Sequence, residues 1–125
     1  MRVVLLDTSL MLDCAKMKLD IFAGLDGLME GAYEVRVSEG VITELRAKAA
    51  QKSKAAGDAK AALAILGAGK VVVETAGFNV DGWLLARGKE LGAVVGTNDA
   101  ALRARLRKAG VKVVSIRGGS RLDFV

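Results

Sequence analysis

The stretch VVLLDTS at residues 3–9 decides the fold, because four apolar residues run directly into a carboxylate and two hydroxyls. A second stretch, AVVGTND at residues 93–99, repeats this pattern near the end of the chain. A short apolar run followed by turn residues predicts a strand that is buried on both faces, as in a parallel sheet. The two strands should therefore present acidic and hydroxyl oxygens at the carboxyl edge of the sheet, where open α/β folds bind ligands.

Predicted strands and helices alternate along the rest of the chain. Residues 46–60 are rich in Ala and Lys with weak breakers at Ser53 and Gly57, so they form either two helices or one loosely jointed helix, and the apolar pattern resumes at 61–66. Strands are predicted at 2–6, 33–37, 71–73, 93–96 and 111–116, and helices at 19–30, after the N-cap Ser38, at 80–91 after the N-cap Asn79, and at 99–109. This alternation predicts an α/β fold, a three-layer α/β/α sandwich with a mostly parallel central sheet.

Length and composition favour a single domain over residues 1–125. The chain has no proline, no low-complexity linker and no internal repeat that would mark a boundary. No apolar run approaches the roughly 18 residues that span a bilayer, and the first strand begins at Arg2, so we expect neither a membrane anchor nor a secretion leader. A single cysteine, Cys14, fits a reducing cytoplasm and the role of a small buried hydrophobic residue.

The absence of histidine from the sequence narrows the possible chemistry. It excludes Ser-His-Asp and Cys-His catalysis, histidine general bases and nearly all zinc sites. A metal held by carboxylate, hydroxyl and amide oxygens would be a hard cation, Mg²⁺ or Mn²⁺. If the chain is an enzyme, oxygen-ligated metal chemistry is therefore the favoured route.

Four acids occupy positions from which they could converge on such a metal. Asp7 and Asp99 follow strands, and Glu44 lies early in the helix after the second strand. Asp81 opens a helix whose inward face carries the next apolar residues, which predicts an inward-pointing carboxylate. Each acid also has an ordinary interpretation as a cap, a turn residue or a surface charge. Together they favour a shared site, in which mutual repulsion calls for bound cations.

The motifs VLLDTS at 4–9, VITEL at 41–45, Asp81 at a helix start and VVGTND at 94–99 together resemble the PIN-domain nucleases over nearly the whole chain. The resemblance implies an α/β/α fold, a ribonuclease that depends on Mg²⁺ or Mn²⁺, and frequent homodimers. By position it implies an acidic quartet for catalysis and metal binding, supported by polar side chains. The quartet is Asp7, Glu44, Asp81 and Asp99, and the supporting residues are Ser9, Thr97 and Asn98.

The stretch LDIF at 19–22 is also similar to small archaeal PIN proteins related to rRNA-processing nucleases, and to VapC-type toxins. A toxin would have an antitoxin protein as a partner, whereas a processing enzyme would not. Two positions depart from the family pattern. Gly96 replaces a bulkier residue, and Arg103 stands where some relatives carry an additional acid, so the site would rest on four acids.

The net charge of +5 favours a polyanionic partner such as RNA, although a basic surface also serves solubility. Basic residues form two candidate RNA-binding patches, each of which could equally be a solvated helix face. One patch consists of Arg103, Arg107 and Lys108, with Arg105 alongside, and the other of Lys48, Lys52 and Lys54.

The leading hypothesis is therefore metal-dependent hydrolysis of RNA phosphodiester bonds, with one or two ions held by the four acids. The alternative, from a different class, is a non-catalytic RNA-binding or assembly module on the same fold. A third possibility, a phosphatase-like enzyme with Asp7 as nucleophile, is disfavoured. Such enzymes usually carry a second acid two residues further on, where this chain has Ser9.

Overall fold

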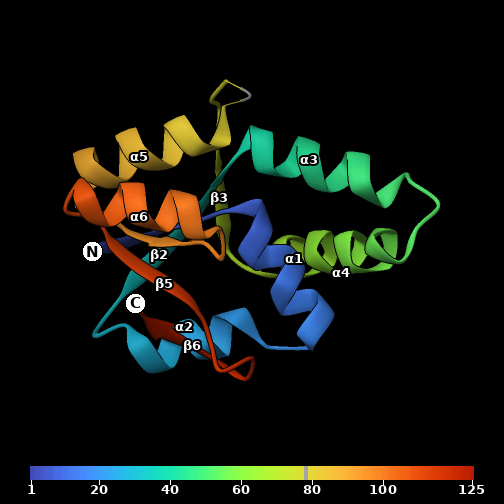
Figure 1. Cartoon of the computed structure of the whole chain (residues 1–125), viewed down its shortest axis with the longest axis horizontal. Coiled ribbons are helices and arrows are strands. Elements are labelled where there is room, and N and C mark those ends of the chain that lie inside the picture. Colours follow the sequence, from blue (N-terminus) through green and yellow to red (C-terminus); the bar gives the residue numbers. More distant parts are fainter. Residues whose placement is uncertain (78) are drawn as a thin grey trace.

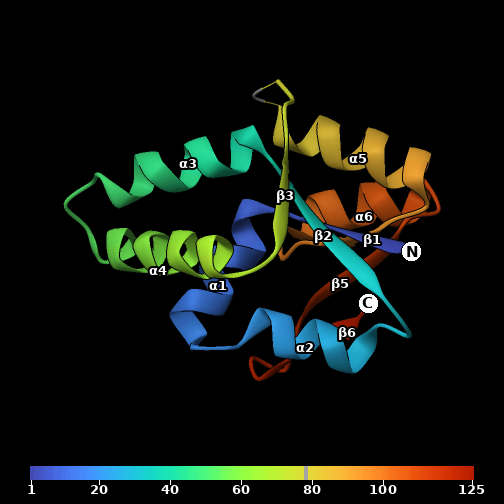
Figure 2. The same cartoon turned by 180° about the vertical axis from the view of Figure 1, so that it is seen from behind.

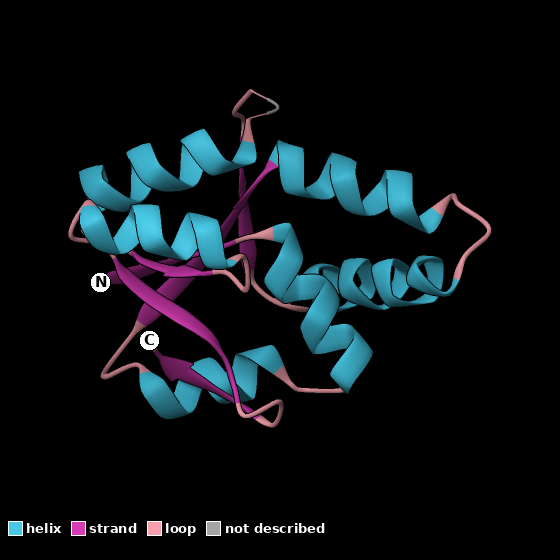
Figure 3. Ribbon diagram, viewed as in Figure 1, coloured by secondary structure: helices cyan, strands magenta, loops and turns pink. Residues whose placement is uncertain are grey.

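The computed structural model describes residues 1–77 and 79–125, in which strands and helices alternate as the sequence predicts (Figures 1 and 3). The strands are β1 (Arg2–Leu6), β2 (Tyr33–Ser38), β3 (Val71–Glu74), β4 (Val94–Gly96), β5 (Lys112–Arg117) and β6 (Arg121–Phe124). The helices are α1 (Thr8–Met17), α2 (Ile21–Leu28), α3 (Glu39–Ala49), α4 (Lys54–Ala68), α5 (Val80–Leu91) and α6 (Ala100–Lys108).

The strands form one sheet in the order β3-β2-β1-β4-β5-β6. All neighbouring strands are parallel except β6, which pairs antiparallel with β5. The two strands that end in acidic motifs, β1 and β4, are central neighbours, and their register places Leu6 beside Gly96. The predicted mostly parallel sheet is confirmed, and its two motif-bearing strands end side by side.

Helices cover both faces of the sheet and complete the three layers (Figures 1 and 2). Helices α5 and α6 lie side by side on one face, while α1 lies on the other, and α2 packs against β6. Helices α3 and α4 form a hairpin whose α4 arm packs against α1. Among the described residues, none of these helices combines the length and hydropathy needed to cross a bilayer.

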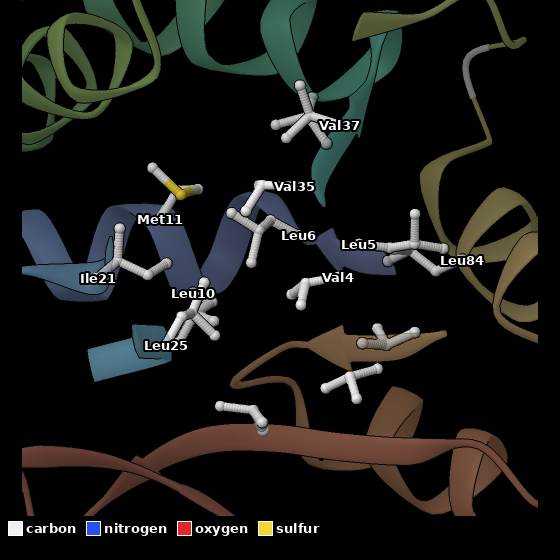
Figure 4. Packing of buried hydrophobic residues seen from close by; sticks show 14 of the residues in the cluster. Val4, Leu5, Leu6, Leu10, Met11, Ile21, Leu25, Val35, Val37 and Leu84 are labelled. Atoms are coloured by element: carbon white, nitrogen blue, oxygen red, sulfur yellow. The ribbon is translucent and has the colours of Figure 1, made fainter. Parts of the chain in front are cut away.

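The hydrophobic core is built around β1, whose residues Val4, Leu5 and Leu6 are fully buried (Figure 4). Because side chains alternate along a strand, Leu5 points to one face, where it lies next to Leu84 of α5, and its neighbours point to the other. Gly96 permits a close approach on that second face, since a Cβ there would lie 2.6 Å from Leu10 Cδ2 of α1. The N-terminal turn of α1 is thereby held against the end of β4.

Local signals explain most element boundaries. Ser38 accepts a hydrogen bond from Val41 N and caps α3, and Asn79 accepts one from Gly82 N and caps α5. Gly92 ends α5 with φ of +59°, a left-handed conformation that glycine adopts without strain. Cys14 is buried, and burial together with the charge of Asp13 raises the pKa of its thiol to about 11, as expected for an inert residue.

Three elements differ from the sequence prediction. Helix α1 at residues 8–17 was not predicted, because Thr8 and Ser9 read as turn residues and concealed the buried pattern of Leu10, Met11 and Cys14. The predicted helix at 19–30 is shorter, since Asp20 caps α2 and its side chain accepts from Ala23 N. The basic tail forms an additional antiparallel strand, β6. Of the two alternatives for residues 46–60, the structure has separate helices.

Glu74 at the end of β3 is the centre of an ion-pair network that ties the sheet to α5. Arg87 binds it at 2.9 and 3.1 Å, Arg36 at 3.0 Å, and the indole N–H of the buried Trp83 at 3.3 Å. Hydrogen bonds from Arg87, opposed by burial and then reinforced by those from Arg36 and Trp83, lower the pKa of Glu74 from 4.5 to about 2. The ionised form of this carboxylate is therefore the one that the fold stabilises.

Glu74→Gln should lower the free energy of unfolding at neutral pH by about 1–2 kcal/mol, since solvent screens the partly exposed arginines. A lowered pKa stabilises the fold above pH 4.5, and this contribution is lost as the pH falls towards 2. Urea denaturation at several pH values should show that loss in the parent protein and a flatter dependence in the variant. Glu90→Gln is the control, because that side chain is 65% exposed. Equal effects of the two substitutions would contradict this role for Glu74.

Candidate active site at the carboxyl edge of the sheet

The ends of β1 and β4 join through Asp7 and Thr97. The backbone N–H of Asp7 donates to Gly96 O at 2.9 Å, which continues the strand pairing by one residue. The Thr97 hydroxyl donates to Asp7 Oδ2 at 2.6 Å, and the Ser9 hydroxyl donates to the same oxygen at 2.8 Å. Two hydroxyls thus fix the orientation of this carboxylate, one from the first turn of α1 and one from the residue after β4, as their position at the shared sheet edge predicts.

The same two hydroxyls also hold the turn that leads into α6. Ser9 Oγ accepts from Asn98 N at 3.2 Å, and Thr97 Oγ1 accepts from Asp99 N at 3.1 Å. Asp99 Oδ1 in turn accepts from Leu102 N at 3.0 Å and caps α6, so the capping role considered for this residue is real. Within the described structure, its second oxygen, Oδ2, accepts no hydrogen bond. Asp99 therefore uses Oδ1 to cap α6 and leaves Oδ2 free to bind a ligand.

Asp7 is buried without a counter-ion. Its exposed fraction is 6%, and within residues 1–77 and 79–125 it forms no ion pair with Lys or Arg. Its side chain does not cap α1, and in this part of the chain its Oδ1 accepts no hydrogen bond. A buried carboxylate without a cationic partner is costly. The site therefore has an oxygen available for a cation and an electrostatic reason to bind one.

Asp81 shares the electrostatic environment of the two junction acids. Partial burial of its carboxylate, followed by the negative charges of Asp7 and Asp99, raises its pKa, while Arg105 opposes the shift. The residue itself is exposed, so the prediction that it turns into the apolar face of α5 was wrong. The inward stripe is carried by Leu84 and Gly88, whereas Asp81 lies in the first turn, at the rim of the sheet edge.

Glu44 is exposed on α3, and it is not among the charges that shift the pKa of Asp81. In the part of the chain that the structure describes, no three Asp, Glu, Cys or His side chains lie close enough together to form a ready-made metal centre. The structure thus brings Asp7 and Asp99 to adjacent strand ends and Asp81 within electrostatic reach of both. The assignment of Glu44 to the quartet remains a prediction.

Asp13 and Ser115 also support the site, the first through the predicted residue Asn98, and neither was predicted from the sequence. Asn98 Nδ2 donates to Asp13 of α1 at 2.8 Å, and Asn98 Oδ1 accepts from Ile116 N at 3.0 Å, so this amide links three elements. Ser115 of β5 donates to Thr97 O and is buried. Ser9 and Asp13 are spaced i, i+4 and therefore lie on one face of a helix. Recognising α1 as a helix would have placed Asp13 next to Ser9 and so near Asn98, which contacts both.

The predicted basic patches lie apart. Figure 1 places α6 at one end of the molecule and the α3–α4 connection, near Lys48 and Lys52, at the other. On α6, Arg107 and Lys108 are exposed, whereas Arg103 is half-buried and donates to Ser115 Oγ at 3.3 Å. Arg105, named only as a neighbour of this patch, is the basic residue whose charge reaches Asp81. Among the described basic residues of the two patches, Arg105 is thus the one linked to an acid of the site, whereas Arg107 and Lys108 lie in the last turn of α6, at the end opposite to Asp99.

The fold and the site define an α/β protein with an acidic ligand site at the carboxyl edge of a mostly parallel sheet. The chain belongs to the PIN-like domain family, whose model matches residues 4–119. The resemblance inferred from the sequence motifs is thereby confirmed. No curated protein sequence matches the chain significantly.

Solved structures show the same fold at low sequence identity. The PIN domain endonuclease Utp24 is 24% identical and superposes with a TM-score of 0.79, over 98% of this chain and 90% of that one. A domain of a functionally unknown protein from Methanocaldococcus jannaschii DSM 2661 is 14% identical, with a TM-score of 0.65 over 94% of this chain and 93% of that one. Both similarities support the PIN-like architecture.

Proposed function

We propose that the chain is a metal-dependent endoribonuclease that hydrolyses RNA phosphodiester bonds at the carboxyl edge of the sheet. The observation that carries this proposal is Asp7, a buried carboxylate that two hydroxyls fix beside Asp99 and whose charge reaches Asp81. Among residues 1–77 and 79–125 it has no counter-ion. Membership of the PIN-like family and the endonuclease activity named for Utp24 support the same function.

The donor set fits a hard divalent cation, Mg²⁺ or Mn²⁺. In the described structure, one oxygen each of Asp7 and Asp99 lacks a hydrogen-bond donor. Partial burial, and then the negative charges of Asp7 and Asp99, raise the pKa of Asp81. These three aspartates would hold the ion, with Glu44 as the fourth acid that the family resemblance implies. When bound, such an ion activates a water molecule and stabilises negative charge on the phosphate.

The remaining side chains orient the acids and bind the substrate backbone. Ser9 and Thr97 fix the Asp7 carboxylate, and Asn98 ties the following turn to α1 and β5. Arg105, Arg107 and Lys108 of α6 offer exposed positive charge to the phosphates that flank the cleaved bond. Lys48 and Lys52 would contact only an RNA that extends across the molecule.

A cleavage assay on single-stranded and structured RNA tests this function directly. Purified protein should cleave internally in Mg²⁺ or Mn²⁺, and EDTA should abolish cleavage until metal is restored. Asp99→Asn, prepared in parallel, should lose activity and thereby exclude a contaminating nuclease. Cleavage that survives EDTA or this substitution would refute the metal mechanism.

The second candidate function is a non-catalytic RNA-binding or assembly module. The exposed basic side chains of α6 favour it, but it offers no reason to keep uncompensated acids close together. Metal binding distinguishes the two, because only the nuclease requires it. The homodimer, a cytoplasmic location, and the choice between a toxin with an antitoxin partner and an RNA-processing enzyme remain predictions from the sequence.

A further inference from the structure

Strand β3 forms one edge of the sheet and is unusually apolar for such a position. It pairs with β2 on one side, and no described strand lies beyond it. Edge strands normally avoid association by carrying charges, prolines or bulges. The edge of this sheet instead presents three successive valines, Val71, Val72 and Val73. Its outer backbone groups are therefore available to another strand.

The side chains of this edge are exposed on both faces of the sheet. Val72 is 43% exposed and Val73 is 49% exposed, which makes them two of the five exposed large hydrophobic residues in the described structure. Two adjoining hollows, of about 300 and 580 Å³, lie between the strand and the α3–α4 hairpin, and both are lined by Ile42, Arg46 and Val73. Figure 2 shows β3 with this hairpin on one side and α5 on the other.

The charges at the two ends of the strand are opposite. Lys70, which precedes β3, is exposed and forms no ion pair within residues 1–77 and 79–125. Glu74, at the other end, belongs to a connected network of two arginines and three glutamates, which carries one net negative charge. An antiparallel copy of the same segment would place each unpaired lysine opposite that network.

We propose that β3 pairs antiparallel with β3 of a second copy of this chain, with Val72 on the twofold axis. In this register, Val71 lies opposite Val73 of the partner subunit, and Lys70 lies opposite the partner's Glu74. Because directly opposed residues share a face of the sheet, the hollows of the two copies adjoin across the axis. The inference stands independently of the proposed nuclease activity.

The self-complementary charge pattern selects a second copy over an unrelated peptide. A general peptide would need apolar residues alone, whereas the KVVVE segment at 70–74 supplies both the valines and the matching charges. Pairing of two four-residue strands buries too little surface for a stable dimer, for which about 1,200 Å² is typical. The flanking residues Ile42, Leu63 and Arg46 must therefore contribute to the interface.

Site-specific cross-linking tests the register. Val72→Cys should form a disulfide between two chains when copper-phenanthroline and oxygen accept the two electrons and two protons released from the thiols. Met17→Cys is the matched control, because Met17 is 44% exposed and lies on α1. Cys14 contributes little thiolate, since its pKa is about 11. Val72→Cys should cross-link at least about tenfold more than the control; equal cross-linking would overturn the proposal.

The solution mass tests the interface without an added cysteine. The full chain at about 0.1 mM should have twice the 13.0 kDa mass of one copy, and Met17→Lys should leave this unchanged. Val72→Lys opposes two like charges at the axis and should raise the dimer dissociation constant by about tenfold or more. Lys70→Glu, which retains all three valines, should also weaken the dimer. A monomeric parent protein, or a dimer insensitive to both edge variants, would overturn the proposal.

Discussion

Asp7→Asn should reduce RNA cleavage by about 10³-fold or more while leaving the protein folded. Asparagine keeps the size of the side chain and one acceptor for Ser9 and Thr97, but it removes the charge that would hold a cation. Initial rates on a fluorescent single-stranded RNA in Mn²⁺ give the measurement. Asp58→Asn is the matched control, since that half-buried aspartate lies on α4, away from the sheet edge, and should retain full activity.

The same substitution should stabilise the metal-free protein. Asp7 is 6% exposed, lacks a counter-ion in the described structure and shares its surroundings with two other carboxylates. Removing this charge relieves both its desolvation and its repulsion, so the free energy of unfolding in EDTA should rise by about 1 kcal/mol. Loss of activity together with loss of stability would instead indicate that Asp7 is a structural residue and would contradict this account of the site.

Leu5→Ala should lower the free energy of unfolding by about 3–4 kcal/mol, the largest single effect expected on stability. Leu5 is fully buried at the centre of the sheet and lies next to Leu84, so truncation leaves a cavity between β1 and α5 (Figure 4). The melting temperature should fall by roughly 10–20 °C. Urea denaturation should show a lower midpoint with an unchanged slope, because the surface exposed on unfolding is nearly the same.

Leu91→Ala provides the control for this prediction, since it makes the same chemical change at a leucine that is 36% exposed. It should cost less than about 1 kcal/mol, because little apolar surface is lost from the core. A comparable loss for the two variants would mean that β1 is not the centre of the core. The position of Asp7 at the end of that strand would then need another explanation.

Much of the architecture follows from local sequence patterns. The runs at 3–6 and 93–96 are apolar on both faces, which only a central parallel strand satisfies, and β1 and β4 occupy those positions. The caps Ser38 and Asn79 were also predicted, because a capping side chain binds a backbone N–H only three residues further along the chain. By contrast, α1 depends on contacts with a distant segment, since it packs on α4. Strand β6 forms a hairpin with the adjacent β5 through Gly118 and Gly119, which both have positive φ, so the basic tail did carry a local turn signal that was overlooked.

The site was only partly predictable for a similar reason. Strand order places Asp7 next to Thr97 once β1 and β4 are neighbours, so this pair follows from topology. Helical spacing placed Asp81 on the buried stripe of α5, but Val80, Trp83, Leu84 and Gly88 form that stripe, and Asp81 lies exposed beside it. The hydrogen bond from Asn98 to Asp13 forms only because α1 and the β4–α6 turn meet at a particular angle. That angle cannot be predicted from the spacing of residues in the sequence.

Calorimetric titration of Mn²⁺ into the metal-free chain of residues 1–125 tests the central claim most directly, because it measures cation binding without any RNA. We predict saturable binding of at least one ion per chain for the parent protein and for Asp58→Asn, and its loss in Asp7→Asn. Absence of binding to the parent protein, or equal binding by Asp7→Asn, would contradict a metal site built on the junction of β1 and β4.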